Sequence, residues 1–93
     1  MEIHIASINC LDESGILHSF RYSLLTELEG ESRFCCEIYG IRITSDRGED
    51  TQMPAVTTSR TEINALLAAL VRNNVGPAGL ADIVTDWKKQ RVG

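Results

Sequence analysis

Cysteine and histidine are the side chains of this sequence with the most versatile chemistry. A four-ligand zinc site could be formed by the three cysteines, Cys10, Cys35 and Cys36, with either His4 or His18. Zinc ligands usually come as close pairs separated by a few residues, and that spacing is missing here. Moreover, Cys35 and Cys36 lie in a segment with strand character, where adjacent side chains point to opposite faces. We therefore expect buried free thiols and no metal site. Both histidines could act as bases, but packing or surface roles explain them more simply.

The remaining candidates for an interaction site lie in the last third of the chain: Arg60, Asp82, Asp86, Trp87, Lys88 and Lys89. Asp82 and Asp86 are four residues apart, a spacing that puts two carboxylates on one side of a helix. Such a pair could bind a divalent ion or transfer protons, but an ordinary exposed helix surface explains it better, since two carboxylates alone make a thin site. Trp87 could be a binding hot spot, although its place on an apolar helical stripe favours core packing.

Two other features could bind anions. Residues 57–60 (TTSR) could bind one at a helix N-terminus, and the basic tail Lys88-Lys89-Gln90-Arg91 could touch phosphate. A helix cap explains the first, and a basic helix end complementing the helix dipole explains the second. The motifs GxxxxGK[ST], GxGxxG, HExxH and GxSxG are absent from the sequence. We therefore expect no catalytic residue and no cofactor, and favour a protein that is not an enzyme.

Composition narrows the class of protein. The 93 residues are 43% hydrophobic and 24% charged, as in one ordinary globular domain. The net charge of −4 argues against a nucleic-acid binder, since phosphate neutralisation needs surplus Lys and Arg. The charge is uneven: residues 1–50 hold ten acids and four bases, and residues 51–93 hold three acids and five bases. The absence of a long apolar run or an export signal predicts a cytoplasmic protein without a membrane span.

The first two thirds of the chain show strand patterns. Residues 1–9 alternate loosely and predict a strand, followed by a loop over 9–15. Residues 17–29 fit a strand better than a helix, and after a turn at 30–32 the segment 33–44 is rich in Phe, Cys, Ile and Tyr. These two runs predict a long hairpin.

Three local features refine this sheet. Gly40, inside the second strand of the hairpin, indicates a bulge or the close approach of a helix. Residues 45–50 (SDRGED) predict a charged turn. Residues 52–56 predict a short strand, which Pro54 confines to an edge of the sheet because proline lacks the N–H of a ladder hydrogen bond.

The last third predicts two helices. Ser59 and Glu62 form a capping box, with the Glu62 carboxylate expected on the Ser59 amide. Apolar residues then recur at helical spacing: Ile63, Leu66, Leu67, Leu70 and Val71. Residues 73–77 (NNVGP) end this helix and start a second one over 77–89. Its apolar stripe has the same spacing: Leu80, Ile83, Val84 and Trp87.

Together these elements predict an α+β fold, with an antiparallel sheet of three to four strands and two C-terminal helices packed on one face. Residues 1–93 are expected to form a single domain, with residues 1–15 as a loosely attached strand or arm.

Several short segments carry a family resemblance as a set: Tyr39-Gly40-Ile41, Thr57-Thr58-Ser59-Arg60, Leu66-Leu67, Val71-Arg72-Asn73-Asn74-Val75, Leu80, Asp82-Ile83-Val84 and Asp86-Trp87. Through them the chain resembles a family of small uncharacterised proteins from clostridia-type Gram-positive bacteria. The likeness covers residues 20–88 and leaves 1–15 outside. It implies a cytoplasmic bacterial protein of a family without an assigned activity, so it transfers no functional residue.

Three functions remain open. We favour a non-catalytic protein-interaction or regulatory module that binds a protein partner or a second copy of itself, because the edge strand at Pro54 leaves a surface to cover. The alternative is a DNA-binding regulatory protein that uses the C-terminal helix pair and the basic tail. The third is a small metal-binding protein or enzyme that uses Cys35, Cys36 and the histidines.

Overall fold

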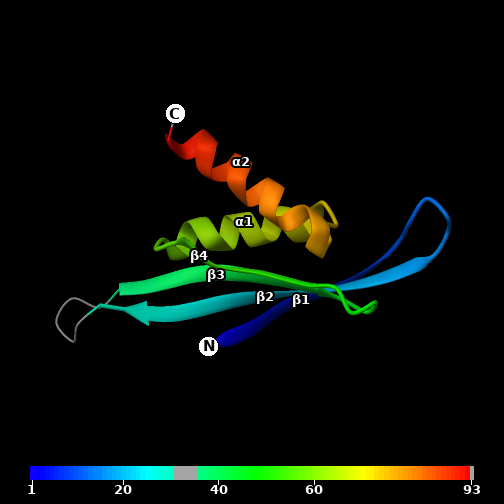
Figure 1. Ribbon diagram of the computed structural model, residues 1–93, viewed down its shortest axis with the longest axis horizontal. Helices are drawn as coiled ribbons and strands as arrows, with labels where there is room; N and C mark the ends of the chain where they lie inside the picture. Colours follow the sequence, from blue (N-terminus) through cyan, green and yellow to red (C-terminus); the bar gives the residue numbers. More distant parts are fainter. Residues whose placement is uncertain (31–35, 93) are drawn as a thin grey trace.

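The computed structural model describes residues 1–30 and 36–92 (Figure 1). Four strands form one antiparallel sheet in the order β1-β2-β3-β4: β1 Glu2–Leu11, β2 Leu17–Glu29, β3 Cys36–Ser45 and β4 Asp50–Thr57. The helical elements follow: α1 Arg60–Arg72, the 3-10 turn η1 Pro77–Gly79, and α2 Leu80–Val92. The predicted α+β fold is therefore confirmed, with four strands and two C-terminal helices.

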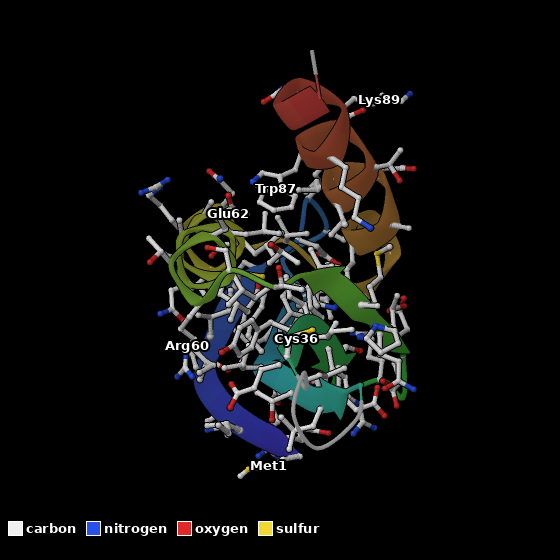
Figure 2. The ribbon with its side chains drawn as sticks, turned by 90° about the vertical axis from the view of Figure 1, so that its left-hand side faces the viewer. Met1, Cys36, Arg60, Glu62, Trp87 and Lys89 are labelled. Carbon is white, nitrogen blue, oxygen red and sulfur yellow. The ribbon has the colours of Figure 1, made fainter. Side chains whose placement is uncertain are left out.

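Both helices lie on the same face of the sheet, which makes two layers (Figure 1). α1 contacts β2, β3 and β4, whereas α2 contacts β4. Seen along the sheet in Figure 2, β1 forms one lateral edge on the side of α1, and β4 forms the other edge on the side of α2. The opposite face of the sheet carries no helix among the described residues.

The core fills the space between the two layers. Its buried members come from β2, β3, β4 and both α-helices: Tyr22, Leu24, Tyr39, Ile41, Ile43, Val56, Ile63, Leu66, Leu67, Leu70, Leu80 and Val84. The strand members alternate along β2 and β3, and the helix members recur every three or four residues, as the sequence pattern predicts. The Tyr22 hydroxyl donates a 2.7 Å hydrogen bond to the Val75 carbonyl and so ties the end of α1 to the sheet.

The N-terminal segment differs from the expectation. β1 runs to Leu11, so the loop predicted over residues 9–15 is too long. In-register pairing with β2, down to Leu11 opposite Leu17, overrides the local preference of Asn9 for a turn. The Met1 amine donates to the Thr26 carbonyl, and the Thr26 amide donates to the Met1 carbonyl, both over 2.8 Å. β1 is therefore paired with β2 from end to end.

The β2–β3 hairpin and the edge position of β4 are confirmed. The predicted turn at 30–32 and the first part of the predicted strand 33–44, Cys35 included, fall largely on residues 31–35, outside the described residues. β4 begins at Asp50, because its first residues pair with β3 up to the turn.

Gly40 lies at an irregularity of the β3–β4 ladder, in line with the bulge that its residue type indicated, and the backbone that approaches it belongs to β4 and not to a helix. The register between β3 and β4 shifts between Tyr39 and Ile41, where β4 carries extra residues around Pro54. A Cβ atom on Gly40 would lie 2.5 Å from the carbonyl carbon and oxygen of Pro54, and closer still to the Met53 carbonyl oxygen. Only glycine fits at this position.

The helix ends follow the predicted logic with two corrections. Ser59 Oγ caps α1 by accepting from the Glu62 amide at 3.2 Å. The Ser59 amide, however, donates to Thr57 Oγ1 at 3.1 Å, and Thr57 donates to Glu62 Oε2 at 2.9 Å. Thr57 thus relays the return contact of the capping box. The second helix begins at Leu80, because Pro77 first starts the 3-10 turn closed by the Gly79 amide on the Gly76 carbonyl.

Candidate interaction surface at the β1 edge

The two edges of the sheet differ in how well they could accept another strand. On β4, Pro54 lacks an N–H group, and the register shift opposite Gly40 interrupts the ladder. The Ala55 carbonyl also receives Lys88 Nζ of α2 at 3.5 Å. Proline, irregular register and a covering lysine are common ways of protecting an edge strand from further pairing. The β4 edge is therefore closed over its central part.

The β1 edge has much less protection. β1 is ten residues long and contains no proline, and no Asp, Glu, Lys or Arg occurs from Ile3 to Leu11. Its one irregularity is a register shift between His4 and Ala6, after which pairing with β2 is regular to Leu11. An edge strand of this kind presents a row of outward backbone N–H and C=O groups to a further strand.

Exposed apolar side chains gather beside this edge. Six of the seven large hydrophobic residues that are exposed among the described residues lie between residue 1 and the first residue of β2: Met1, Ile3, Ile5, Leu11, Ile16 and Leu17. The seventh, Leu28, lies toward the end of β2. Single exposed apolar residues are ordinary, but a group beside an open strand marks a surface suited to contact.

An apolar groove of about 470 Å³ runs between β1 and α1, and we call it the β1–α1 groove. Its lining comes from both elements: Ile5, Ala6, Asn64, Leu67, Ala68, Val71 and Arg72. Leu67 belongs to the core, and Ala6 and Val71 pack against the core. The groove is thus a lateral extension of the core, left open where no element covers the side of α1 above β1.

A polar cluster on the helix-free face holds β1 in place. Arg42 of β3 donates from Nη1 to Glu2 Oε1 at 2.9 Å, and from Nε and Nη2 to the two oxygens of Asp50 at 2.9 and 2.5 Å. Hydrogen bonds from Arg42 lower the pKa of both Glu2 and Asp50, and these two carboxylates raise the pKa of Arg42. One guanidinium thereby links β1, β3 and β4.

Replacing Arg42 with methionine is expected to raise the pKa values of Glu2 and Asp50 toward their ordinary range. A lowered folded-state pKa stabilises the fold above the unfolded-state pKa of about 4, and this contribution disappears as pH falls through the folded-state pKa. The variant should therefore lose less stability on acidification than the wild type. Carboxyl-carbon NMR titrations measure the change.

Asp12 serves as an internal control in the same spectra. Its pKa is lowered by a different group, His18, together with the amides of Ile16 and Ser14. The Asp12 titration should not move in the Arg42→Met protein. Unchanged titrations of Glu2 and Asp50 would show that Arg42 does not hold these carboxylates.

The interaction candidates of the C-terminal third lie apart from the β1–α1 groove. Asp82, Asp86, Lys88 and Lys89 are all exposed along α2. The Arg60 guanidinium lies 5.6 Å from the centre of the Tyr39 ring, in a cation–π contact. These residues do not line the groove that the structure reveals.

Trp87 is half-buried and packs against the core, in line with its position on the apolar stripe. Figure 2 shows its ring directed from α2 toward α1, on the side where Glu62 lies. Both residues line a shallow pocket with residues 57–59, which are part of the anion site considered over residues 57–60. There the hydroxyls of Thr57 and Ser59 serve the helix cap, and the Glu62 carboxylate would oppose an anion.

Cys35 lies outside the described residues, and the other cysteine and histidine candidates are spread over the β1–β2 hairpin and β3. Cys10 and Cys36 are free thiols; Cys10 is half-buried, but Cys36 is exposed, so the expectation of buried thiols is wrong for Cys36. His4 Nε2 lies 2.9 Å from Ser7 Oγ, and His18 Nε2 lies 2.8 Å from Asp12 Oδ2. Within residues 1–30 and 36–92, no three His, Cys, Asp or Glu side chains are grouped to hold a metal ion.

Taken one by one, the residues that form this surface have no distinguishing pattern in the sequence. Apolar residues of this kind usually lie in the core, and the sequence does not show whether another element covers them. This applies to Ile3, Ile5, Ala6 and the side of α1 around Val71. One signal was present in the sequence: the uncharged run from residue 3 to 11 within an acidic N-terminal half.

The chain belongs to a family of unknown function, DUF6514, which it matches over residues 1–90. The match includes residues 1–15, so the narrower likeness over residues 20–88 is corrected, and β1 is part of the family domain. No curated protein and no solved structure matches the chain. Over the described residues, none of the helices has the length and apolar character needed to cross a membrane.

Proposed function

We propose that this domain is a non-catalytic protein-interaction module that binds an extended protein segment by strand addition at the β1 edge. The observation that supports this proposal is the juxtaposition of a ten-residue edge strand, uncharged from Ile3 to Leu11, with the β1–α1 groove. In strand addition, backbone hydrogen bonds supply affinity, and pockets for alternate side chains supply specificity. The β1 edge offers the first and the groove the second.

The chemistry of the groove indicates what kind of strand it suits. Ile5, Leu67 and Val71 supply apolar surface, with Asn64 and Arg72 as polar members of the lining. A strand that alternates apolar and polar residues would place its apolar side chains over the groove and its polar ones on the helix-free face. We therefore propose an amphipathic strand as the bound segment.

The proposed edge is also held in its binding conformation. The paired hydrogen bonds between Met1 and Thr26 fix the start of β1, and the Arg42–Glu2 ion pair holds it on the polar face. An edge that is already ordered loses little conformational freedom on binding, so more of the contact energy appears as affinity.

We also propose that the protein works in the bacterial cytoplasm. The resemblance to clostridia-type proteins supports a bacterial source, and the free thiols of Cys10 and Cys36 support a reducing compartment. Fractionation of the producing cells, followed by thiol labelling of the intact protein, tests the location. Recovery in an oxidised, extracellular fraction would contradict it.

Site-specific crosslinking in living cells tests the interaction module. A photoreactive benzophenone amino acid at position 5, on the β1 edge, is expected to form a covalent adduct of one defined mass. The same amino acid at position 85, exposed on α2, is the matched control and should yield little adduct. No adduct at position 5 above the position-85 level would overturn the proposed function.

A further inference from the structure

We infer that the strand bound at the β1 edge is β1 of a second copy of this chain, paired antiparallel about a two-fold axis. This inference rests on the proposed function and names its partner. The pairing would join two four-stranded sheets into one continuous sheet of eight strands, with both α1 helices on the same side. A two-fold interface uses one surface twice, so that surface must be complementary to itself.

The charges on β1 meet this requirement. The whole chain carries a net charge of −4, so two copies repel one another overall. β1 is an exception, because no charged Asp, Glu, Lys or Arg side chain occurs from Ile3 to Leu11. Glu2 lies at one end of the strand, where antiparallel pairing keeps the two copies of it far apart. Each Glu2 is also paired with its own Arg42.

The side chains of β1 also have the alternation that the groove suits. Ala6 and Ile8 lie opposite Tyr22 and Phe20 of β2 and pack against the core, so they lie on the helix side of the sheet. Cys10 follows on the same side. Ser7 and Asn9 alternate with them and lie on the polar face. β1 is therefore itself an amphipathic strand of the kind proposed for the bound segment.

Antiparallel pairing would bring the apolar side chains of one β1 close to the β1–α1 groove of the second copy. Figure 1 shows the β1–β2 hairpin extending past the end of the helix layer. Antiparallel pairing sets the second half of one β1 beside the first half of the other. Ile8 and Cys10 of each copy would then approach the partner's groove at Ile5. The exposed Leu11 at the hairpin end would approach the start of the partner's β1.

A stable dimer must bury more surface area than the β1 strand edge alone provides, so the groove must be part of the interface. A ladder of ten residues is about 33 Å long, and a stable interface buries about 800 Å² on each partner. A strand edge alone is too narrow to supply that area, so the α1 side of the groove and the hairpin end must contribute. These are the surfaces where the exposed apolar side chains gather.

Sedimentation velocity on the purified full-length chain, from low to high micromolar concentration, tests the inference. The wild type should change reversibly from monomer to dimer. Ile5→Lys should weaken dimerisation at least about tenfold, because it places a charge in the apolar contact of each copy. Ile5 is 44% exposed in the single chain, so the substitution should leave the thermal melt of the monomer nearly unchanged.

Thr85→Lys is the matched control, because it introduces the same charged side chain at an exposed residue of α2, away from the β1 edge. It should dimerise like the wild type. Hydrogen exchange supplies a second measurement: outward-facing amides of β1 should gain protection as the concentration rises. A dimer that keeps these amides unprotected and survives Ile5→Lys would use another surface, and would overturn the inference.

The composition of the crosslinked adduct at position 5 distinguishes a failure of this inference from a failure of the proposed function. An adduct of twice the chain mass, containing only this sequence, supports the second copy. An adduct with a different protein, together with a monomeric purified chain, overturns the second copy and leaves the interaction module standing. No adduct and no dimer overturns both.

Discussion

Gly40→Ala is expected to leave the domain unfolded or only marginally stable. The added Cβ would lie 2.5 Å from the carbonyl carbon and oxygen of Pro54 and closer still to the Met53 oxygen, all of them backbone atoms of β4. A flexible side chain could move aside, whereas a backbone can move only if the strand does. Overpacking usually costs about 1–3 kcal/mol, and we expect at least the upper value here. Domains of this kind have about 5–15 kcal/mol in total.

Gly79→Ala is the matched control for Gly40→Ala. A Cβ at Gly79 would meet Val75 Cγ1 at 3.5 Å, an ordinary contact. The residue lies in η1, where alanine restricts the unfolded chain more than glycine does, so the substitution should be neutral or slightly stabilising. Urea unfolding followed by circular dichroism compares the two variants. Equal midpoints for Gly40→Ala and the wild type would contradict the close approach of β3 and β4.

Leu80→Ala is expected to destabilise the domain by about 2–5 kcal/mol. Leu80 opens α2, has no exposed surface, and belongs to the core beneath the helices. Truncation to alanine removes apolar contacts and leaves a cavity where α2 meets the sheet. Because α2 contacts the sheet mainly through β4, few other contacts can compensate. The chain should unfold at a much lower urea concentration, with a red shift of Trp87 fluorescence through the same transition.

Leu28→Ala controls for the chemical change itself, since it removes the same atoms from a leucine that is 67% exposed on β2. Its stability should stay within about 0.5 kcal/mol of the wild type. If both leucine variants shifted the urea midpoint equally, α2 would not be held through Leu80, and the core assignment would be wrong. The pair thus measures burial separately from residue type.

The two edges of the sheet differ in their protection against further strand pairing, and this difference limits where another strand could bind. Pro54 and the Lys88 contact on Ala55 protect β4, which is why we propose strand addition at β1. A proline introduced into β1 could close this edge as Pro54 closes β4. It would do so only at a residue whose N–H points away from β2, because only those N–H groups are available to a further strand. The Ile5→Lys test is simpler, because it leaves the backbone of β1 unchanged.

Local patterns determined much of this fold. Alternation in residues 17–29 and 33–44 predicted the hairpin, since a strand with one buried face must repeat every two residues. Ser59 predicted the start of α1, because its hydroxyl satisfies an amide within the same turn. Pro54 predicted an edge strand, because a missing N–H has the same consequence in any sheet. In each case the partners are close in sequence, or the residue type alone decides.

Only the tertiary structure decided which distant groups meet. Arg42 joins Glu2, forty residues away, and Asp50, and nothing near Arg42 in the sequence identifies these partners. The full length of β1 depends on its register with β2, which outweighs the turn preference of Asn9. The β1–α1 groove arises because α1 lies over the sheet without covering β1 completely. The sequence does not show whether apolar residues such as Ile5 and Val71 are covered by another element or left open. The candidate binding surface is therefore visible only in the folded chain.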